Sequence, residues 1–261
     1  MRELFTMWRN TRMIVMTAIS AAAYVAVLLP FKGFVIIPGL TEVRPGAAIP
    51  VVLSFLFGPA TAWGTGFGNV IADALGGMLG PGSLFGFIGN FFYGYLPYAL
   101  WRAFMGHKSP VLSGPRGWLL FGIILITNCL VIGSIIGWGA DLLRLAPFGA
   151  LGPIIAVNNF IASAAISTIL LALLYERVSV WGLLYFQILD ERGEAFSARI
   201  GAILCVAGSL IAFFTGLIIS IGALDVGLGV SAFASEIKGT MAVAGGMAPG
   251  LLLILLGAIL L

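Results

Sequence analysis

The sequence predicts an all-α integral membrane protein, and three observations carry this prediction. Of the 261 residues, 61% are hydrophobic and 9% charged, and the mean hydropathy of +1.13 lies far above that of soluble domains. The apolar residues gather in runs long enough to cross a hydrocarbon core about 30 Å thick as helices. The 36 glycines fit the same class, because helices in lipid pack through small residues that let their backbones approach.

Charges, prolines and glycine clusters divide the chain into about eight candidate transmembrane helices. These cover residues 12–30, 46–58, 60–79, 84–105, 117–139, 153–175, 200–222 and 239–261. The second is short, because Gly58 and Pro59 end it and turn the chain directly into the third. The first is expected to be retained, because the segment before it, "MRELFTMWRNTR", is too long and too aromatic for a cleavable signal.

One apolar segment, Val178 to Leu189, is too short to span a membrane and is bracketed by charged residues. It predicts an interfacial helix with Trp181 and Tyr185 at the level of the lipid headgroups. If this segment spanned instead, the last two helices would be inverted. The expected division is therefore a helical core over 1–175, a linker over 176–199 and a hairpin of two transmembrane helices over 200–261.

The distribution of lysine and arginine predicts the orientation. With the N-terminus inside, the basic residues divide nine to four in favour of the inside, as the positive-inside rule requires. The inside set is Arg2, Arg9, Arg12, Arg102, Lys108, Arg116, Arg177, Arg192 and Arg199, and the outside set is Lys32, Arg44, Arg144 and Lys238. We expect the protein to lie in the plasma membrane, with both termini in the cytoplasm.

Several functional classes are disfavoured. Cys129 and Cys205 lie inside apolar runs without CxxC spacing, which argues against a disulfide or a metal site. A single histidine excludes the HExxH motif, and no P-loop or GxSxG motif is present. The small net charge of +3 is scattered and does not suggest a nucleic-acid surface. The prediction is a protein that is not an enzyme and has no cofactor.

Polar residues within the spans predict a binding site, because such groups are expensive in hydrocarbon and mark functional positions by default. All the candidates fall in the outer half of the predicted bundle or in the loops above it, which suggests a pocket open to the outside for a small molecule. The candidates are Glu42 and Arg44 in the first loop, and Asn69, Asp73, Asn90, Tyr93, Trp138, Asn158 and Asn159 in the spans.

Each candidate also has a structural interpretation. An intramembrane asparagine can simply join two helices, at about 0.6 kcal/mol on average. Asp73 could pair with Arg44 or Arg144, because a buried charge needs a partner. Glu42 and Arg44 could be an ordinary interfacial pair.

The first span contains "AISAAAYVA", which places Ala18, Ala22 and Ala26 on one smooth helix face. Together with "RPGAAIPVVLSFLFGPATAWGTGFGNVIADALGG", the arrangement resembles the substrate-binding S components of energy-coupling factor (ECF) transporters. The resemblance is best over Ala18 to about Arg102 and extends to Tyr175. It implies a six-helix bundle with both termini cytoplasmic, to which the C-terminal hairpin is an addition.

The resemblance also implies a function and partners. S components capture a vitamin or related micronutrient near the outer face, under the loop after the first helix and against helices four to six. Their alanine face docks on a membrane T subunit that works with two ATPase subunits. Glu42 and Arg44 would then orient or gate the ligand. The main alternative is a stand-alone secondary transporter or channel-like protein with Asp73 as a proton or cation site, and a weaker one is an assembly factor without a ligand.

Overall fold

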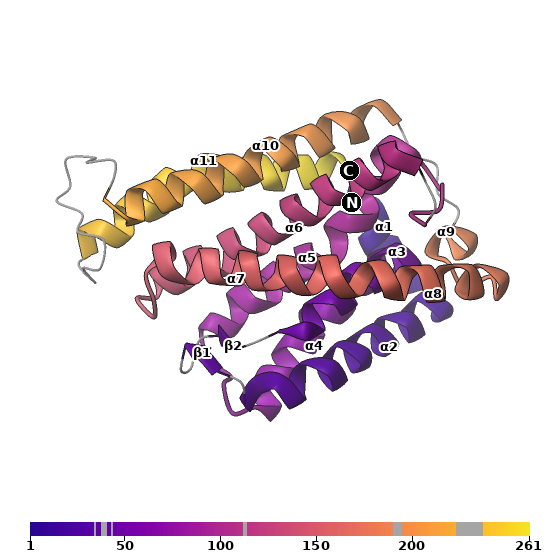
Figure 1. Ribbon diagram of the computed structural model, residues 1–261, viewed down its shortest axis with the longest axis horizontal. Helices are drawn as coiled ribbons and strands as arrows, with labels where there is room; N and C mark the ends of the chain where they lie inside the picture. The colour runs from indigo at the N-terminus through magenta and orange to yellow at the C-terminus, as the bar shows by residue number, and fades with distance from the viewer. Residues whose placement is uncertain (34, 38–40, 43, 112–113, 190–194, 223–236) are drawn as a thin grey trace.

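The computed structural model describes residues 1–33, 35–37, 41–42, 44–111, 114–189, 195–222 and 237–261. Its described part is a bundle of long helices that run roughly parallel or antiparallel to one another (Figure 1). The one sheet among these residues is a two-stranded antiparallel ladder in which Val35 is paired with Glu42. This ladder, in the loop after the first long helix, was not foreseen from the sequence.

The helices follow the apolar runs closely. A short helix and a turn, α1 (Arg2–Thr6) and η1 (Met7–Arg9), precede the first long helix α2 (Thr11–Leu28). The remaining elements are η2 (Leu29–Gly33), β1 (Val35–Ile37), β2 (Thr41–Glu42), η3 (Pro45–Ala47), α3 (Ala48–Phe57), α4 (Pro59–Leu75), α5 (Gly82–Met105), α6 (Gly114–Leu142), α7 (Phe148–Ala162), η4 (Ser163–Ser167), α8 (Thr168–Val180), α9 (Tyr185–Ile188), α10 (Ala195–Ser220) and α11 (Ile237–Leu260).

The tight turn between α3 and α4 forms as the sequence predicts. Gly58 has φ of 53°, a backbone conformation that residues other than glycine rarely adopt. A Cβ atom at this position would lie 2.5 Å from the ring of Tyr185. Pro59 then opens α4, where its missing N–H and fixed φ suit the first helical position.

Five helical stretches in the described residues are long and apolar enough to cross a membrane. They are Thr11–Phe31, Gly114–Leu142, Phe148–Ile188, Phe196–Ser220 and Thr240–Leu260, and Pro45–Phe57 is a shorter apolar helix. The chain is thus a helical, multi-pass membrane protein. In the third stretch α7, the π-helical segment η4 and α8 follow one another without a break, and a turn and α9 complete it.

The segment expected as an interfacial helix has a different structure. Instead of a helix over Val178 to Leu189, α8 continues to Val180, and a turn at Trp181 and Gly182 follows. The helix resumes for only one turn in α9, where Tyr185 is buried. Gly182 explains the break, because its φ of 67° ends α8 in a left-handed conformation.

The last two long helices, α10 and α11, pack against each other along their length (Figure 1). The contact is made by glycines. A Cβ atom on Gly201 would lie 2.6 Å from the carbonyl oxygen of Gly257, and one on Gly208 would lie 2.8 Å from that of Gly250. The two backbones therefore touch directly, as close packing in lipid favours.

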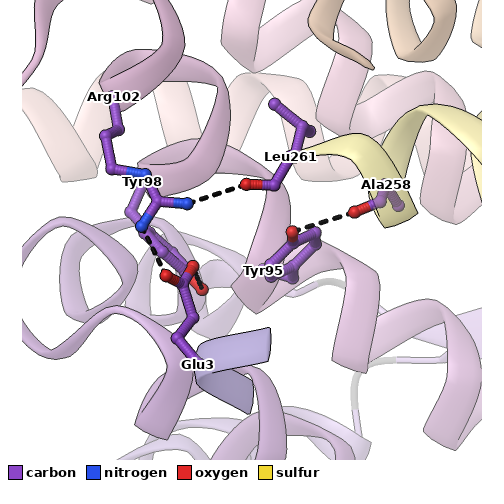
Figure 2. A network of polar contacts seen from close by, with 6 residues as sticks. All are labelled: Glu3, Tyr95, Tyr98, Arg102, Ala258 and Leu261. Atoms are coloured by element: carbon purple, nitrogen blue, oxygen red, sulfur yellow. Dashed lines mark hydrogen bonds and ion pairs between the residues drawn. The ribbon is translucent and has the colours of Figure 1, made fainter. Parts of the chain in front are cut away.

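This hairpin is also joined to α5 by polar contacts at the end of α11, as Figure 2 shows. The Tyr95 hydroxyl donates to the carbonyl oxygen of Ala258 at 3.0 Å, and an Arg102 Nη2 donates to that of Leu261 at 2.8 Å. Arg102 also forms an ion pair with Glu3, which accepts a second hydrogen bond from the hydroxyl of Tyr98 at 3.0 Å. Arg102 thus links α1, α5 and the end of α11. The last carbonyl groups of a helix have no partner within it, and Arg102 provides one for α11.

Candidate functional site

A chain of buried side-chain hydrogen bonds crosses α2, α4 and α5. The Tyr24 hydroxyl donates to Oδ1 of Asn90 at 2.7 Å, and Nδ2 of Asn90 donates to Oδ1 of Asn69 at 3.0 Å. Nδ2 of Asn69 in turn donates to Oδ2 of Asp73 at 3.1 Å, and Asn90 makes a further bond to the carbonyl of Gly86 at 2.8 Å. The amides of Asn69 and Asn90 therefore join three helices, α2, α4 and α5.

Small residues make room for this chain. A Cβ atom on Gly86 would lie 2.5 Å from Nδ2 of Asn69. A Cβ atom on Gly94 would lie 2.6 Å from Oγ1 of Thr65, the hydroxyl that donates to the carbonyl of Asn90 at 2.8 Å. The glycines of α5 thus bring α4 close enough for its amide and hydroxyl groups to reach across.

A second polar cluster lies one turn further along α5, around Tyr93. Its hydroxyl is 2.6 Å from Oγ of Ser163 in η4 and 3.9 Å from the thiol of Cys129 in α6. Ser163 also donates to the carbonyl of Ala47 in η3 at 3.2 Å, and Nδ2 of Asn128 donates to the carbonyl of Tyr93 at 3.0 Å. The cluster joins α5, α6, η3 and η4 one turn along α5 from Asn90.

Among the described residues, six buried side-chain polar atoms have no hydrogen-bond partner, and three of them belong to amide or indole groups. They are Oδ1 of Asn159, Oδ1 of Asn128 and Nε1 of Trp138. Asn159 is 1% exposed and lies four residues before Ser163, so it is on the same side of the α7–η4 helix as the Tyr93 cluster. Buried polar groups are normally satisfied, and an unsatisfied amide oxygen and indole N–H are therefore available to a ligand.

The structure brings together some of the predicted site residues. Asn69, Asp73 and Asn90 form one chain, and Tyr93 lies on the next turn of α5. Asn159 faces the interior, whereas the adjacent Asn158 is half-buried.

Other predicted residues are set apart or lie beyond the description. The ring of Trp138 contacts that of Phe85, with their centroids 5.7 Å apart. Trp138 also packs against the apolar cluster around Phe148. Arg44, immediately before η3, is 9% exposed. The side chain of Glu42 lies outside the described residues, and so does the expected Glu42 contact with Arg44.

The sequence analysis did not single out Tyr24, Thr65 or Ser163. For Tyr24 a signal existed, because it lies on the opposite side of the first helix from Ala22 and Ala26. Thr65 and Ser163 gave no signal, since their hydroxyl groups could equally have bonded within their own helices.

The three alanines of the first span all lie on an exposed face of α2. Ala18, Ala22 and Ala26 are exposed, while Tyr24 and Leu28 on the other side are buried. The face is shallow and apolar, and in the structure it is uncovered. Within the described residues, no cluster of three histidine, cysteine, aspartate or glutamate side chains could hold a metal ion.

Comparison with known proteins gives one match. The model of a family described as QueT transporter matches residues 14–176, which is more than half of the chain. The matched region begins in α2, contains every candidate site residue and the alanine face, and ends within α8 before the hairpin of α10 and α11. Neither the curated proteins nor the solved structures gave a match. The chain belongs to the QueT transporter family, whose members are S components of ECF transporters.

Proposed function

We propose that this chain captures a queuosine precursor at the membrane and delivers it to an ATP-driven ECF importer. The observation that carries the proposal is membership of a family of S components for queuosine precursor uptake. The exposed alanine face of α2 supports it, because a smooth apolar surface of this kind suits close packing with another membrane helix.

In this proposal α2 docks on a T subunit, and two ATPase subunits supply the energy. Ala18, Ala22 and Ala26 form the docking face. Residues 1–175 are a six-helix core with both termini in the cytoplasm, 176–199 are a linker and 200–261 are an added transmembrane hairpin. The positive-inside distribution of lysine and arginine supports this orientation.

The proposed ligand site lies in the outer half of the core. Queuosine is a modified guanosine, so its precursors present a flat heterocycle edged by hydrogen-bond donors and acceptors. The unsatisfied amide oxygen of Asn159 matches such an edge, and Tyr93 provides an aromatic wall. The unsatisfied indole N–H of Trp138 lies apart from them, beside Phe85, and is proposed as a further contact. The remaining proposed ligand residues are Glu42, Arg44, Asn69, Asp73, Asn90 and Asn158.

Docking is tested by Ala22→Leu. A leucine on the alanine face should prevent close approach of the T subunit and abolish both co-purification of the energising subunits and uptake. Ligand affinity should stay near wild type, because the ligand site is elsewhere. The matched control is Ala165→Leu, an exposed alanine on η4 away from that face. Uptake and co-purification that survive Ala22→Leu would refute the docking assignment.

Ligand binding is tested by the thermal shift of the purified chain with 7-deazaguanine bases, with riboflavin as a comparison for vitamin transport. Asn159→Ala should reduce the ligand-induced shift, because it removes a buried hydrogen-bonding partner worth about 1–3 kcal/mol. For Asp73→Asn, a lower melting temperature with an unchanged ligand shift would assign Asp73 to the structure and remove it from the site. Uptake by the chain alone, driven by a proton gradient, would favour the secondary-transporter alternative.

A further inference from the structure

The flank of the bundle between α6 and α8 contains a groove that the transport function does not use. At one end α6 and α7 are tightly packed, since a Cβ atom on Gly133 would lie 2.8 Å from the carbonyl of Gly152. Beyond η4, towards the start of α6, a groove of about 380 Å³ separates α6 from α8. Its size is within the range of about 300–1,000 Å³ found for ligand pockets.

The lining of this groove is apolar. It includes Trp118 and Phe121 from α6, and Ile169, Leu171, Ala172 and Leu173 from α8. Trp118 is 50%, Ile169 61% and Leu173 57% exposed, whereas Phe121 and Leu171 form a buried floor. A groove of this kind on the side of a membrane-spanning bundle faces the hydrocarbon, so an acyl chain fits its chemistry.

Exposed basic residues lie next to the groove lining in the sequence. Lys108, close to the lining residue Pro110, and Arg116, two residues before Trp118, are both exposed. Exposed residues at the end of α8 are Glu176 and Arg177. The segments next to the lining therefore contain three exposed cations and one exposed carboxylate.

The nearby histidine adds no charge at neutral pH. Partial burial, helped by the Arg102 guanidinium and opposed by Glu3, lowers the pKa of His107 below its ordinary value. The balance of exposed charges next to the groove lining stays positive, and Trp118 adds an aromatic ring of the type that lies at the membrane interface.

We infer that the groove between α6 and α8 binds an anionic phospholipid, with an acyl chain along Phe121, Leu171 and Ala172 and the headgroup phosphate at Arg116 and Lys108. Basic side chains attract anionic headgroups near a bilayer surface, and these two basic residues lie next to the apolar lining in the sequence. The site does not overlap the Tyr93 and Asn90 clusters, and the inference is independent of the transported substrate.

The test uses the full chain purified in detergent, with dioleoyl-phosphatidylglycerol and dioleoyl-phosphatidylcholine as probes that differ only in headgroup. Phosphatidylglycerol should bind more tightly and raise the melting temperature more. Ala172→Trp, which fills the groove, should remove the difference between the lipids. Arg116→Gln should weaken binding of phosphatidylglycerol about fivefold and that of phosphatidylcholine less, because the choline group already neutralises its phosphate.

Matched controls keep the result specific. Ala165→Trp adds the same bulk outside the groove, and Arg199→Gln removes an exposed charge from the start of α10; both should behave as wild type. Equal binding of the two lipids, or undiminished binding by Ala172→Trp, would overturn the inference. A thermal shift from glycerol phosphate alone would instead indicate a free-phosphate site. Protection of Ala172→Cys from a thiol reagent only in complexes with the energising subunits would show that a protein helix covers the groove.

Discussion

The hairpin of α10 and α11 and the group of α2, α4 and α5 hold their helices together in different ways. In the hairpin, Gly201, Gly208, Gly250 and Gly257 bring backbone against backbone. In the group of α2, α4 and α5, the side chains of Tyr24, Asn69 and Asn90 reach across the interfaces.

Both kinds of helix contact follow from the lipid that surrounds the protein. Lipid gives helices no hydrophobic reason to associate, so they rely on van der Waals contact or on hydrogen bonds. Close contact through glycine forms a rigid joint with nothing to offer a ligand. A joint made of amides and hydroxyls contains groups that can exchange one partner for another. The hairpin is therefore suited to support, and the polar joints of the core to binding.

The largest effect is expected from Gly250→Ala. The added Cβ atom would fall against the backbone nitrogen and Cα of Ala212, and backbone atoms cannot rotate away as a side chain can. Overpacking of this kind destabilises by about 1–3 kcal/mol or more, so the melting temperature of the full chain should fall clearly. Gly245→Ala is the matched control, because a Cβ there meets nothing within 4 Å. If both variants melt alike, the hairpin is not held by close backbone contact.

An intermediate effect is expected from Asn90→Ala, which leaves the Tyr24 hydroxyl and Oδ1 of Asn69 without their partners. Stranding buried polar groups costs about 1–3 kcal/mol. The Tyr24→Phe variant and the double variant complete a cycle that measures the coupling between the two side chains. Strictly additive effects would mean that the amide chain does not act as a unit.

The smallest effect is expected from Tyr95→Phe, which removes one hydrogen bond from the core to the hairpin, that to the carbonyl of Ala258. The loss should be about 0.5–1.5 kcal/mol, and faster amide hydrogen exchange at the end of α11 would locate it. Tyr98→Phe is the comparison on the same helix, because it removes a hydroxyl that donates to Glu3 in α1. Equal exchange in the two variants would show that Tyr95 does not hold the hairpin.

The sequence was a good guide to the helices and a partial guide to the site. Apolar runs and breakers such as Gly58 place the helices, because span length and turn chemistry are local properties. The sequence left the role of Asn69 and Asn90 open, because an asparagine within a helix gives the same sequence pattern whether its side chain bonds to another helix or to a ligand. The contact of Tyr93 with Ser163 joins residues 70 positions apart, and nothing in the local pattern of either residue encodes it.

The π-helical segment η4 determines how the side chains of α8 are rotated about the helix axis relative to those of α7. The buried residues Asn159, Ser163, Ser167, Leu171 and Tyr175 recur every fourth position. In a regular α-helix four residues turn about 400°, so an every-fourth pattern drifts about 40° at each step. The wider turn of a π-helix offsets part of that drift. If Ser163–Ser167 formed a regular α-helix instead, the steps from Asn159 to Leu171 would turn about 1,200° in total, and the two side chains would point about 120° apart. The π-helical segment η4 therefore keeps α7 and α8 in register.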